Sequence, residues 1–161
     1  MLKKARKGFT LIEMLVVVGI IVALIALVGF VGPALTRPAK VAAWEGNMKN
    51  LQEALMIYAN QNGEHYPSPP TSATDIKTWL TTTKVGDYLS KPIENPFYKD
   101  TAVQIQSGTT GLKAVDDSSL ASAAAPVIGY TKTTDATTGI EHFTITWKIG
   151  SNTYTLSDGV R

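Results

Sequence analysis

The fold is decided by the stretch Gly8-Phe9-Thr10-Leu11-Ile12-Glu13-Met14-Leu15, after which the chain stays apolar as far as Leu35. No charged residue occurs from Met14 to Leu35, a run of 22 positions. As a helix, this run would be about 33 Å long, because an α-helix rises about 1.5 Å per residue. That length matches the hydrocarbon core of a bilayer, so the sequence predicts a helix that spans a membrane.

A short basic leader precedes this run. The basic residues in it are Lys3, Lys4, Arg6 and Lys7. Basic residues beside a membrane span stay on the cytoplasmic side. We therefore expect a single span with the leader in the cytoplasm.

Glu13 interrupts the apolar stretch five positions after Gly8. An ionised carboxylate is costly in hydrocarbon, so an acid there predicts a function and needs a partner. Cleavage after Gly8 would create a cationic α-amino group on Phe9, which the Glu13 carboxylate of a neighbouring copy could neutralise. The same cut would remove the basic leader. The sequence therefore predicts that Gly8 and Phe9 form a processing site and that Phe9 and Glu13 act in assembly.

The segment from Gly8 to Val31 resembles the class III signal of type IV pilins and type II secretion pseudopilins. The resemblance is carried by the basic leader, the Gly8-Phe9 junction and Glu13 at the fifth position of the mature chain. It implies cleavage between Gly8 and Phe9 by a prepilin peptidase, N-methylation of Phe9, and assembly of many copies into a helical filament. In that filament, Glu13 would contact the Phe9 amine of an adjacent subunit.

The resemblance also implies partners and a location. Before assembly the chain would reside in the inner membrane, where pilus or type II secretion machinery would take it up. Afterwards it would form an extracellular pilus or a periplasmic pseudopilus. Many pilins have a helix-bending proline where this chain has Phe30, and its first proline is Pro33, so the position of any bend is left open.

Two simpler interpretations fit less well. A plain membrane anchor explains the apolar run but not the sequence from Gly8 to Glu13. A secretory signal peptide has an apolar region of about 7–15 residues that ends in a small-residue cleavage site. Here the apolar run is longer and ends at Pro33-Ala34-Leu35-Thr36-Arg37.

The remaining sequence is long enough for one small domain. After Pro38, apolar residues recur every three or four positions, which predicts an amphipathic helix that ends near Asn62-Gly63. We therefore expect one long, interrupted helix from about Phe9 to Asn62. The expected divisions are a leader at 1–8, an apolar helix at 9–37, and a head at 38–161 that contains a helix at 39–62, a connecting loop at 63–100 and a β-region at 101–161.

The β-region shows the alternation of half-buried strands. Phe143, Ile145, Trp147 and Ile149 alternate with polar residues, and strands are also predicted at 127–131 and 154–156. The segment 103–106 predicts a short edge strand. The fold class is therefore α+β and pilin-like, with a three- or four-stranded antiparallel sheet covering Trp44, Met48, Leu51 and Leu55.

The connecting loop is rich in proline, and a short helix capped by the segment 72–75 is expected within it. Tyr66-Pro67, Tyr88-Leu89 and Asn95-Pro96-Phe97 resemble the connecting region of major pseudopilins, with Asn95 in place of the usual acid. The simpler interpretation, which we prefer, is a stiff loop whose aromatic side chains bury themselves on the head.

Composition limits the possible functions. The chain has 161 residues and a formal charge of +2, but without the four basic residues of the leader it has 11 basic against 13 acidic residues, so charge does not support a nucleic-acid partner. The absence of cysteine excludes disulfides, zinc–thiolate sites and a cysteine nucleophile.

No motif for catalysis is present, so we expect no enzyme activity and no cofactor. His65 and His142 are interpreted as surface residues. Asp116 and Asp117, followed by two serines, offer oxygen ligands, but calcium usually needs six to eight, and no metal site is predicted. A structural filament subunit is favoured over a membrane-tethered ligand- or DNA-binding module. Within the filament class, a type IV pilin is favoured over a major pseudopilin.

Overall fold

The computed structural model describes residues 9–116 and 125–159, without the side chains of residues 27–35. The chain divides into two compact units, Met1–Ala39 and Lys40–Arg161. The boundary between them falls within the first helix, α1, which runs from Leu11–Gln61.

Helix α1 is continuous through Pro33 and Pro38, so the predicted interruption of this helix is wrong. Proline removes one backbone donor from a helix, but its fixed φ is close to the helical value, so the neighbouring turns can continue. The helix ends as predicted beside Asn62-Gly63. Gly63 is left-handed with φ +68°, and the backbone N–H of Glu64 donates to the carbonyl of Ala59 at 2.8 Å.

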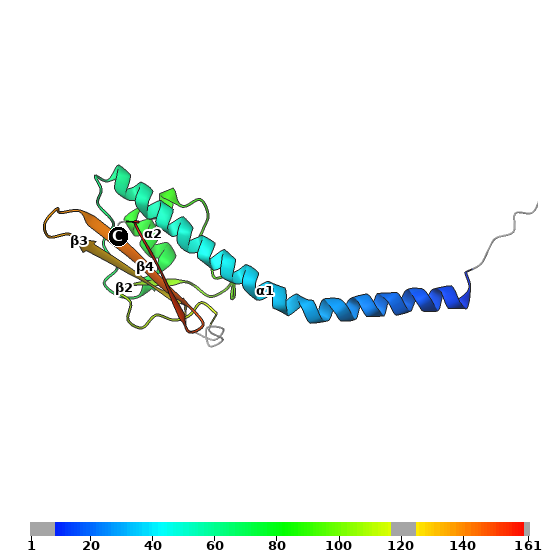
Figure 1. Ribbon diagram of the computed structural model, residues 1–161. Coiled ribbons are helices and arrows are strands. Elements are labelled where there is room, and N and C mark those ends of the chain that lie inside the picture. Colours follow the sequence, from blue (N-terminus) through cyan, green and yellow to red (C-terminus); the bar gives the residue numbers. More distant parts are fainter. Residues whose placement is uncertain (1–8, 117–124, 160–161) are drawn as a thin grey trace, which may run out of the picture. The chain divides into compact units, whose positions relative to one another are not determined.

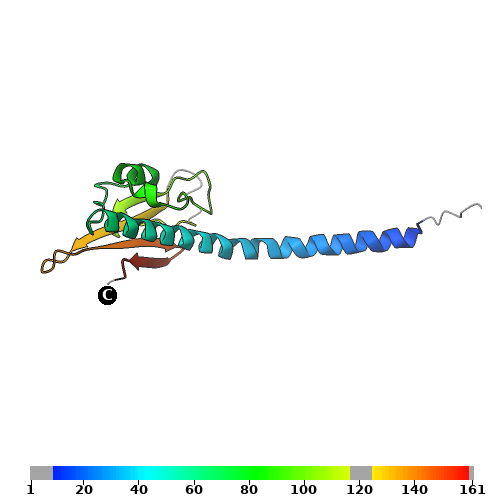
Figure 2. The same cartoon turned by 90° about the horizontal axis from the view of Figure 1, so that it is seen from above.

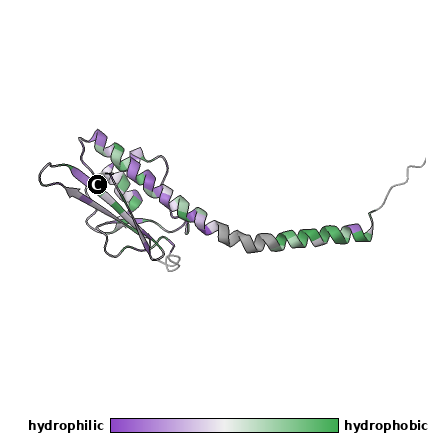
Figure 3. Cartoon of the chain, viewed as in Figure 1, coloured by the Kyte–Doolittle hydropathy of each residue, from purple (hydrophilic) through white to green (hydrophobic). Residues whose placement is uncertain are grey.

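In the unit Met1–Ala39, the described apolar side chains are exposed. Their relative exposure ranges from 45% at Val17 to 84% at Leu11. Figure 3 shows this part of α1 as almost uniformly hydrophobic up to the grey residues. Among the residues whose structure is described, no helix is both long enough and apolar enough to cross a bilayer.

The unit Lys40–Arg161 contains a five-stranded sheet in the order β1-β2-β3-β4-β5. Neighbouring strands are antiparallel except β2 and β3, which are parallel. The strands are β1 (Thr74–Asp75), β2 (Gln104–Ser107), β3 (Val127–Thr134), β4 (Glu141–Ile149) and β5 (Asn152–Ser157).

The α+β fold is confirmed, and the predicted antiparallel meander corresponds to β3, β4 and β5. The expectation of a purely antiparallel sheet is corrected by the β2–β3 pair. A parallel pair needs a connection of about a dozen residues or more, and residues 108–126 are enough. The predicted edge strand, β2, lies inside the sheet because β1 pairs with its other side.

The predicted short helix is α2 (Ile76–Thr83), and a 3₁₀ turn, η1 (Val85–Tyr88), follows it. The Asp75 side chain caps α2 by accepting hydrogen bonds from the backbone N–H groups of Lys77 and Thr78, at 2.8 and 3.4 Å. Such a cap supplies acceptors for N–H groups that lack a partner within the helix.

The second half of α1 lies along the sheet (Figures 1 and 2). Its predicted apolar stripe is the helical side of the core: Trp44, Met48, Leu51 and Leu55 are at most 1% exposed. The fully buried side chains that the sheet contributes to the same core are Ile105, Ile128, Tyr130, Phe143 and Ile145.

Candidate functional site

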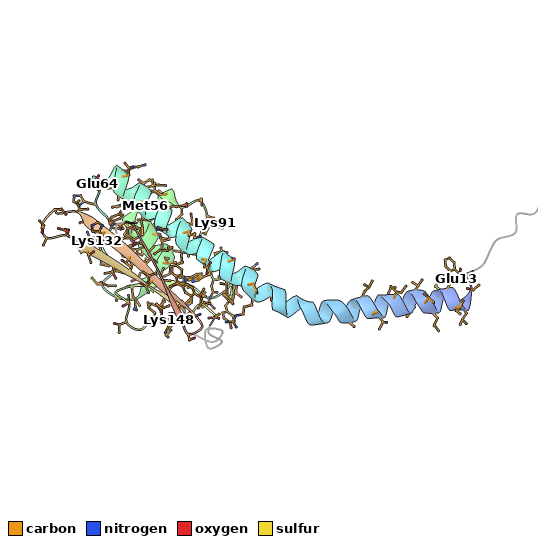
Figure 4. The ribbon with its side chains drawn as sticks, in the orientation of Figure 1. Glu13, Met56, Glu64, Lys91, Lys132 and Lys148 are labelled. Carbon is orange, nitrogen blue, oxygen red and sulfur yellow. The ribbon has the colours of Figure 1, made fainter. Side chains whose placement is uncertain are left out.

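The predicted assembly residue Glu13 lies in the first turn of α1 (labelled in Figure 4). Its carboxylate accepts hydrogen bonds from the backbone N–H and the hydroxyl of Thr10, at 2.8 and 2.7 Å. The Glu13 N–H approaches the Thr10 hydroxyl oxygen at 3.3 Å. This reciprocal arrangement is a capping box, and a negative charge here also interacts favourably with the helix dipole.

The capping box gives Glu13 a partner within its own chain. The predicted partner, the Phe9 amine of a neighbouring copy, requires cleavage and a second chain, so that contact stays a prediction. Phe9 is 77% exposed, and Gly8 lies outside the described residues. The spacing Thr-x-x-Glu at the start of an apolar helix is the sequence signature of a capping box, so the sequence alone is sufficient to predict this contact.

In the head, three side chains hold three consecutive carbonyls of the loop after α1. The Lys132 ammonium donates to the carbonyl of Tyr66 at 3.2 Å, and the Tyr130 hydroxyl donates to that of Pro67 at 2.9 Å. The Trp79 indole N–H donates to the carbonyl of Ser68 at 3.2 Å. The Tyr66-Pro67 element therefore has a structural role here, which supports the simpler interpretation.

Glu141 joins this loop to β4. Its carboxylate accepts hydrogen bonds from the Tyr66 backbone N–H at 2.7 Å and from Lys132 at 3.0 Å, and it lies 3.4 Å from the His65 ring. Burial alone would raise the pKa of Glu141. The hydrogen bonds from Lys132 and Tyr66, the positive charge of Lys132 and the His65 contact outweigh burial and lower it.

This lowered pKa predicts a loss of stability in acid. The unfolded carboxyl group binds protons more readily than the folded one, so the free energy of unfolding should fall as the pH drops below the ordinary value of 4.5. Glu141→Gln should destabilise the head at neutral pH by about 1–3 kcal/mol, because it weakens hydrogen bonds to a charged group. The same substitution should also reduce the fall in the free energy of unfolding between neutral and acidic pH.

Denaturant unfolding of the full-length chain between neutral pH and pH 3 would measure both effects. Glu53→Gln is the matched control, because it makes the same substitution at an exposed position of α1. If the stability of Glu141→Gln depended on pH as that of the wild type does, Glu141 would not be a source of the acid-dependent loss.

Both histidines, interpreted as surface residues, have an acidic partner. His142 Nδ1 lies 2.8 Å from the Asp158 carboxylate, and His65 contacts Glu141. A cavity of about 410 Å³ lies beside these pairs and is also lined by Met56 and Ile140. Within the described part of the chain, no three His, Cys, Asp or Glu side chains are placed to hold a metal ion.

Asn95 replaces the acid expected from the pseudopilin resemblance. Its side-chain carbonyl accepts hydrogen bonds from the backbone N–H groups of Phe97 and Tyr98, at 2.9 and 3.2 Å. Asn47 and Asn50 of α1 donate to the carbonyls of Glu94 and Lys91, at 2.8 and 2.9 Å. The two N–H groups of this turn need an oxygen acceptor, and the amide oxygen of Asn95 serves as a carboxylate oxygen would.

The loop considered for calcium is only partly described. The Asp116 carboxylate accepts a hydrogen bond from the backbone N–H of Gly150 at 2.6 Å. Asp117 and the two serines after it lie outside the described residues. The described contact ties this loop to the β4–β5 turn.

Comparison with known protein families identifies the N-terminal segment. Residues 3–29 match the prokaryotic N-terminal methylation motif. The chain therefore carries a class III prepilin signal, as type IV pilins and pseudopilins do, which confirms the resemblance seen in the sequence. This motif points to a structural protein rather than an enzyme. No curated protein and no solved structure gives a significant match to the chain.

Proposed function

We propose that this chain is a type IV pilin-like subunit that polymerises through the apolar part of α1 into an extracellular filament. The observation that carries the proposal is the methylation motif at residues 3–29, which leads into α1, whose large apolar side chains from Leu11 to Ile25 are exposed. A continuous apolar surface of this extent calls for a covering. Lipid would cover it in the inner membrane, and neighbouring copies would cover it in the filament.

The processing site is Gly8-Phe9. A membrane-embedded prepilin peptidase would cut between these residues, and the new amine of Phe9 would then be methylated. Cleavage also removes the leader and its four basic residues, which otherwise hold this end of the chain on the cytoplasmic side. Only the cut chain could then leave the membrane and enter a filament.

The same signal begins type II secretion pseudopilins, which assemble in the periplasm. The connecting loop, with Tyr66-Pro67 and Asn95-Pro96-Phe97, favours this second candidate. In this chain, however, Tyr66-Pro67 is hydrogen-bonded to β3 and β4, and the Asn95 side chain closes its own turn beside carbonyls that α1 holds. We therefore favour the pilus, and imaging of cell-surface filaments with and without the protein separates the two.

The processing step gives the first test of the proposal. Intact-mass measurement of purified filaments should give a chain that begins at Phe9 and carries one added methyl group, because cleavage and methylation precede assembly. Deletion of the peptidase should leave a chain of full length in the membrane. A filament subunit that begins at Met1, or near Arg37, would contradict the proposed processing site.

A further inference from the structure

Within the described residues, no strand pairs with the outer side of β5, which leaves one edge of the sheet open. It is the last strand in the sheet order, and its sequence Asn-Thr-Tyr-Thr-Leu-Ser contains no charge and no proline (Figure 2). Proteins commonly protect an edge with charges, proline, bulges or very short strands. The opposite edge, β1, is short, with only two residues, whereas β5 has six residues and none of the other devices.

The β4–β5 hairpin decides which backbone groups face outward. Ile149 pairs with Asn152 across a two-residue loop in which Gly150 has φ +57°. In such a hairpin this closing pair is hydrogen-bonded, and hydrogen-bonded pairs then alternate along the ladder. The N–H and C=O groups of Thr153, Thr155 and Ser157 therefore face away from β4.

One contact agrees with this alternation. The side-chain amide of Gln52 in α1 donates a hydrogen bond to the carbonyl of Ser157, which must therefore face away from β4. The carbonyl of Ser157 thus has a partner. Thr153 and Thr155 present both of their backbone groups at the open edge, and both residues are exposed.

The core also extends to this edge. Tyr154 stacks on Trp147 of β4 with 5.8 Å between ring centroids and 14° between planes. Tyr154 and Leu156 pack against the core but are only half-buried. A further strand would therefore satisfy backbone groups and cover apolar surface in one step.

We propose that β5 pairs antiparallel with β5 of a second copy, about a two-fold axis that passes through Tyr154. In this register Thr153 lies opposite Thr155 of the other copy, in both directions, so all the outward groups of both threonines are used. A shift by two residues in one direction would place Ser157 opposite Thr153 and require the carbonyl that Gln52 occupies. A shift in the other direction would place Thr155 opposite Ser151, which lies outside β5.

The edge is complementary to itself. An antiparallel pair of identical strands places the same patch on both sides, as a two-fold interface requires. Here it brings no like charges together, sets threonine opposite threonine, and places the two Tyr154 rings side by side. Threonine and aromatic cross-strand pairs are both favourable. A continuous row Trp147–Tyr154–Tyr154–Trp147 would then cross the junction.

This pairing is distinct from filament assembly. Two-fold pairing reverses one copy relative to the other, whereas subunits along a head-to-tail filament share one direction. The β5 pair would therefore join copies from two filaments. Its failure would leave the proposed filament function intact, and failure of filament assembly would not abolish it.

The absence of cysteine from the sequence permits a direct test in the full-length chain. Tyr154→Cys places the two thiols opposite each other across the axis, and oxidation should give a disulfide-linked dimer on a non-reducing gel. Thr82→Cys, at an exposed position of α2, should not. Absence of a dimer for Tyr154→Cys, or equal dimer for both variants, would overturn the proposal.

A backbone block tests whether the edge itself forms the contact. Adding Thr155→Pro to Tyr154→Cys removes an outward N–H that the second copy would bind, so the dimer should be abolished. The head should still fold, because an edge strand tolerates proline where its nitrogen faces outward. Thr155→Val keeps the N–H and should retain the dimer. Circular dichroism of each variant establishes that the head has folded. Equal dimer in the proline and valine variants would contradict pairing through β5.

Two double variants that keep Tyr154 test the register and the identity of the partner. Thr153→Glu with Thr155→Lys places opposite charges across the axis, and filaments prepared separately from two strains with different tags should still purify together after mixing. Thr153→Lys with Thr155→Lys places like charges there and should reduce co-purification. Equal recovery of the two variants would contradict pairing with a second copy in this register. The same result is expected if another protein occupies the edge.

Discussion

Glu13→Ala is expected to leave the chain inserted in the membrane and cleaved after Gly8, but to reduce ordered filament assembly strongly. In the proposed filament, the apolar surfaces of neighbouring helices would hold copies together with little preference for one axial position. A carboxylate among them is removed from water and needs a cation. The α-amino group of Phe9 on an adjacent copy is the nearest candidate. Their pairing would fix the stagger between subunits even where its net stability is small.

The capping box within the chain makes a sharper control possible. Glu13 already binds the backbone N–H and hydroxyl of Thr10, so Glu13→Ala removes both a cap and a charge. Glu13→Gln retains an oxygen acceptor for the cap but no charge, and should fail like Glu13→Ala. Thr10→Val removes only the hydroxyl and should assemble far better than either. Normal assembly with Glu13→Gln would assign Glu13 to capping alone.

These outcomes are measured by expressing each variant as the sole copy and counting filaments by electron microscopy. Membrane levels and the mass of the processed chain are followed in parallel, so that a loss of insertion or cleavage is not mistaken for a loss of assembly. Normal number and length of filaments for Glu13→Ala, at normal membrane levels, would rule out the assembly role.

Leu51→Ala should destabilise the head by about 2–5 kcal/mol, because it removes buried methyl groups and leaves a cavity. Leu51 is fully buried between α1 and the sheet. Ile57→Ala is a matched control on the same helix, since Ile57 is 44% exposed and its truncation opens no closed cavity. It should cost far less.

Thermal and denaturant unfolding of the full-length chain would compare the two variants with the wild type. The reporter should be near-ultraviolet circular dichroism, because Trp44 and Trp147 are buried in the head and lose their fixed surroundings when it unfolds. Equal stability of Leu51→Ala and the wild type would show that this face of α1 does not carry the core.

The sequence was sufficient where a pattern is local. The spacing of Trp44, Met48, Leu51 and Leu55 predicted the buried face of α1, and the alternation from Phe143 to Ile149 predicted β4. The segment 72–75 before Ile76 predicted a capped helix, which is α2 with Asp75 as its cap. In each case a period or a cap depends on residues a few positions apart, so the chain displays it directly.

The features that the sequence did not predict depend on partners far apart in the chain or on weak local preferences. The parallel pairing of β2 with β3 and the addition of β1 follow from a long connection and from Thr74 meeting Ile105. The pair of His142 and Asp158 joins two strand ends that the hairpin brings together. Helix α1 continues through Pro33 and Pro38, because a proline removes one hydrogen bond while the turns on either side keep theirs.

The ties between α1 and the loop before β2 have a mechanical consequence. Asn47 and Asn50 bind this loop, and Gln52 binds the end of β5. A force that pulls a subunit along its helix must slide α1 across these contacts and across the apolar stripe together. The load is then shared among many bonds in parallel, whereas peeling the helix from one end would break them one at a time. Such a head resists tension along its helix better than a sideways pull.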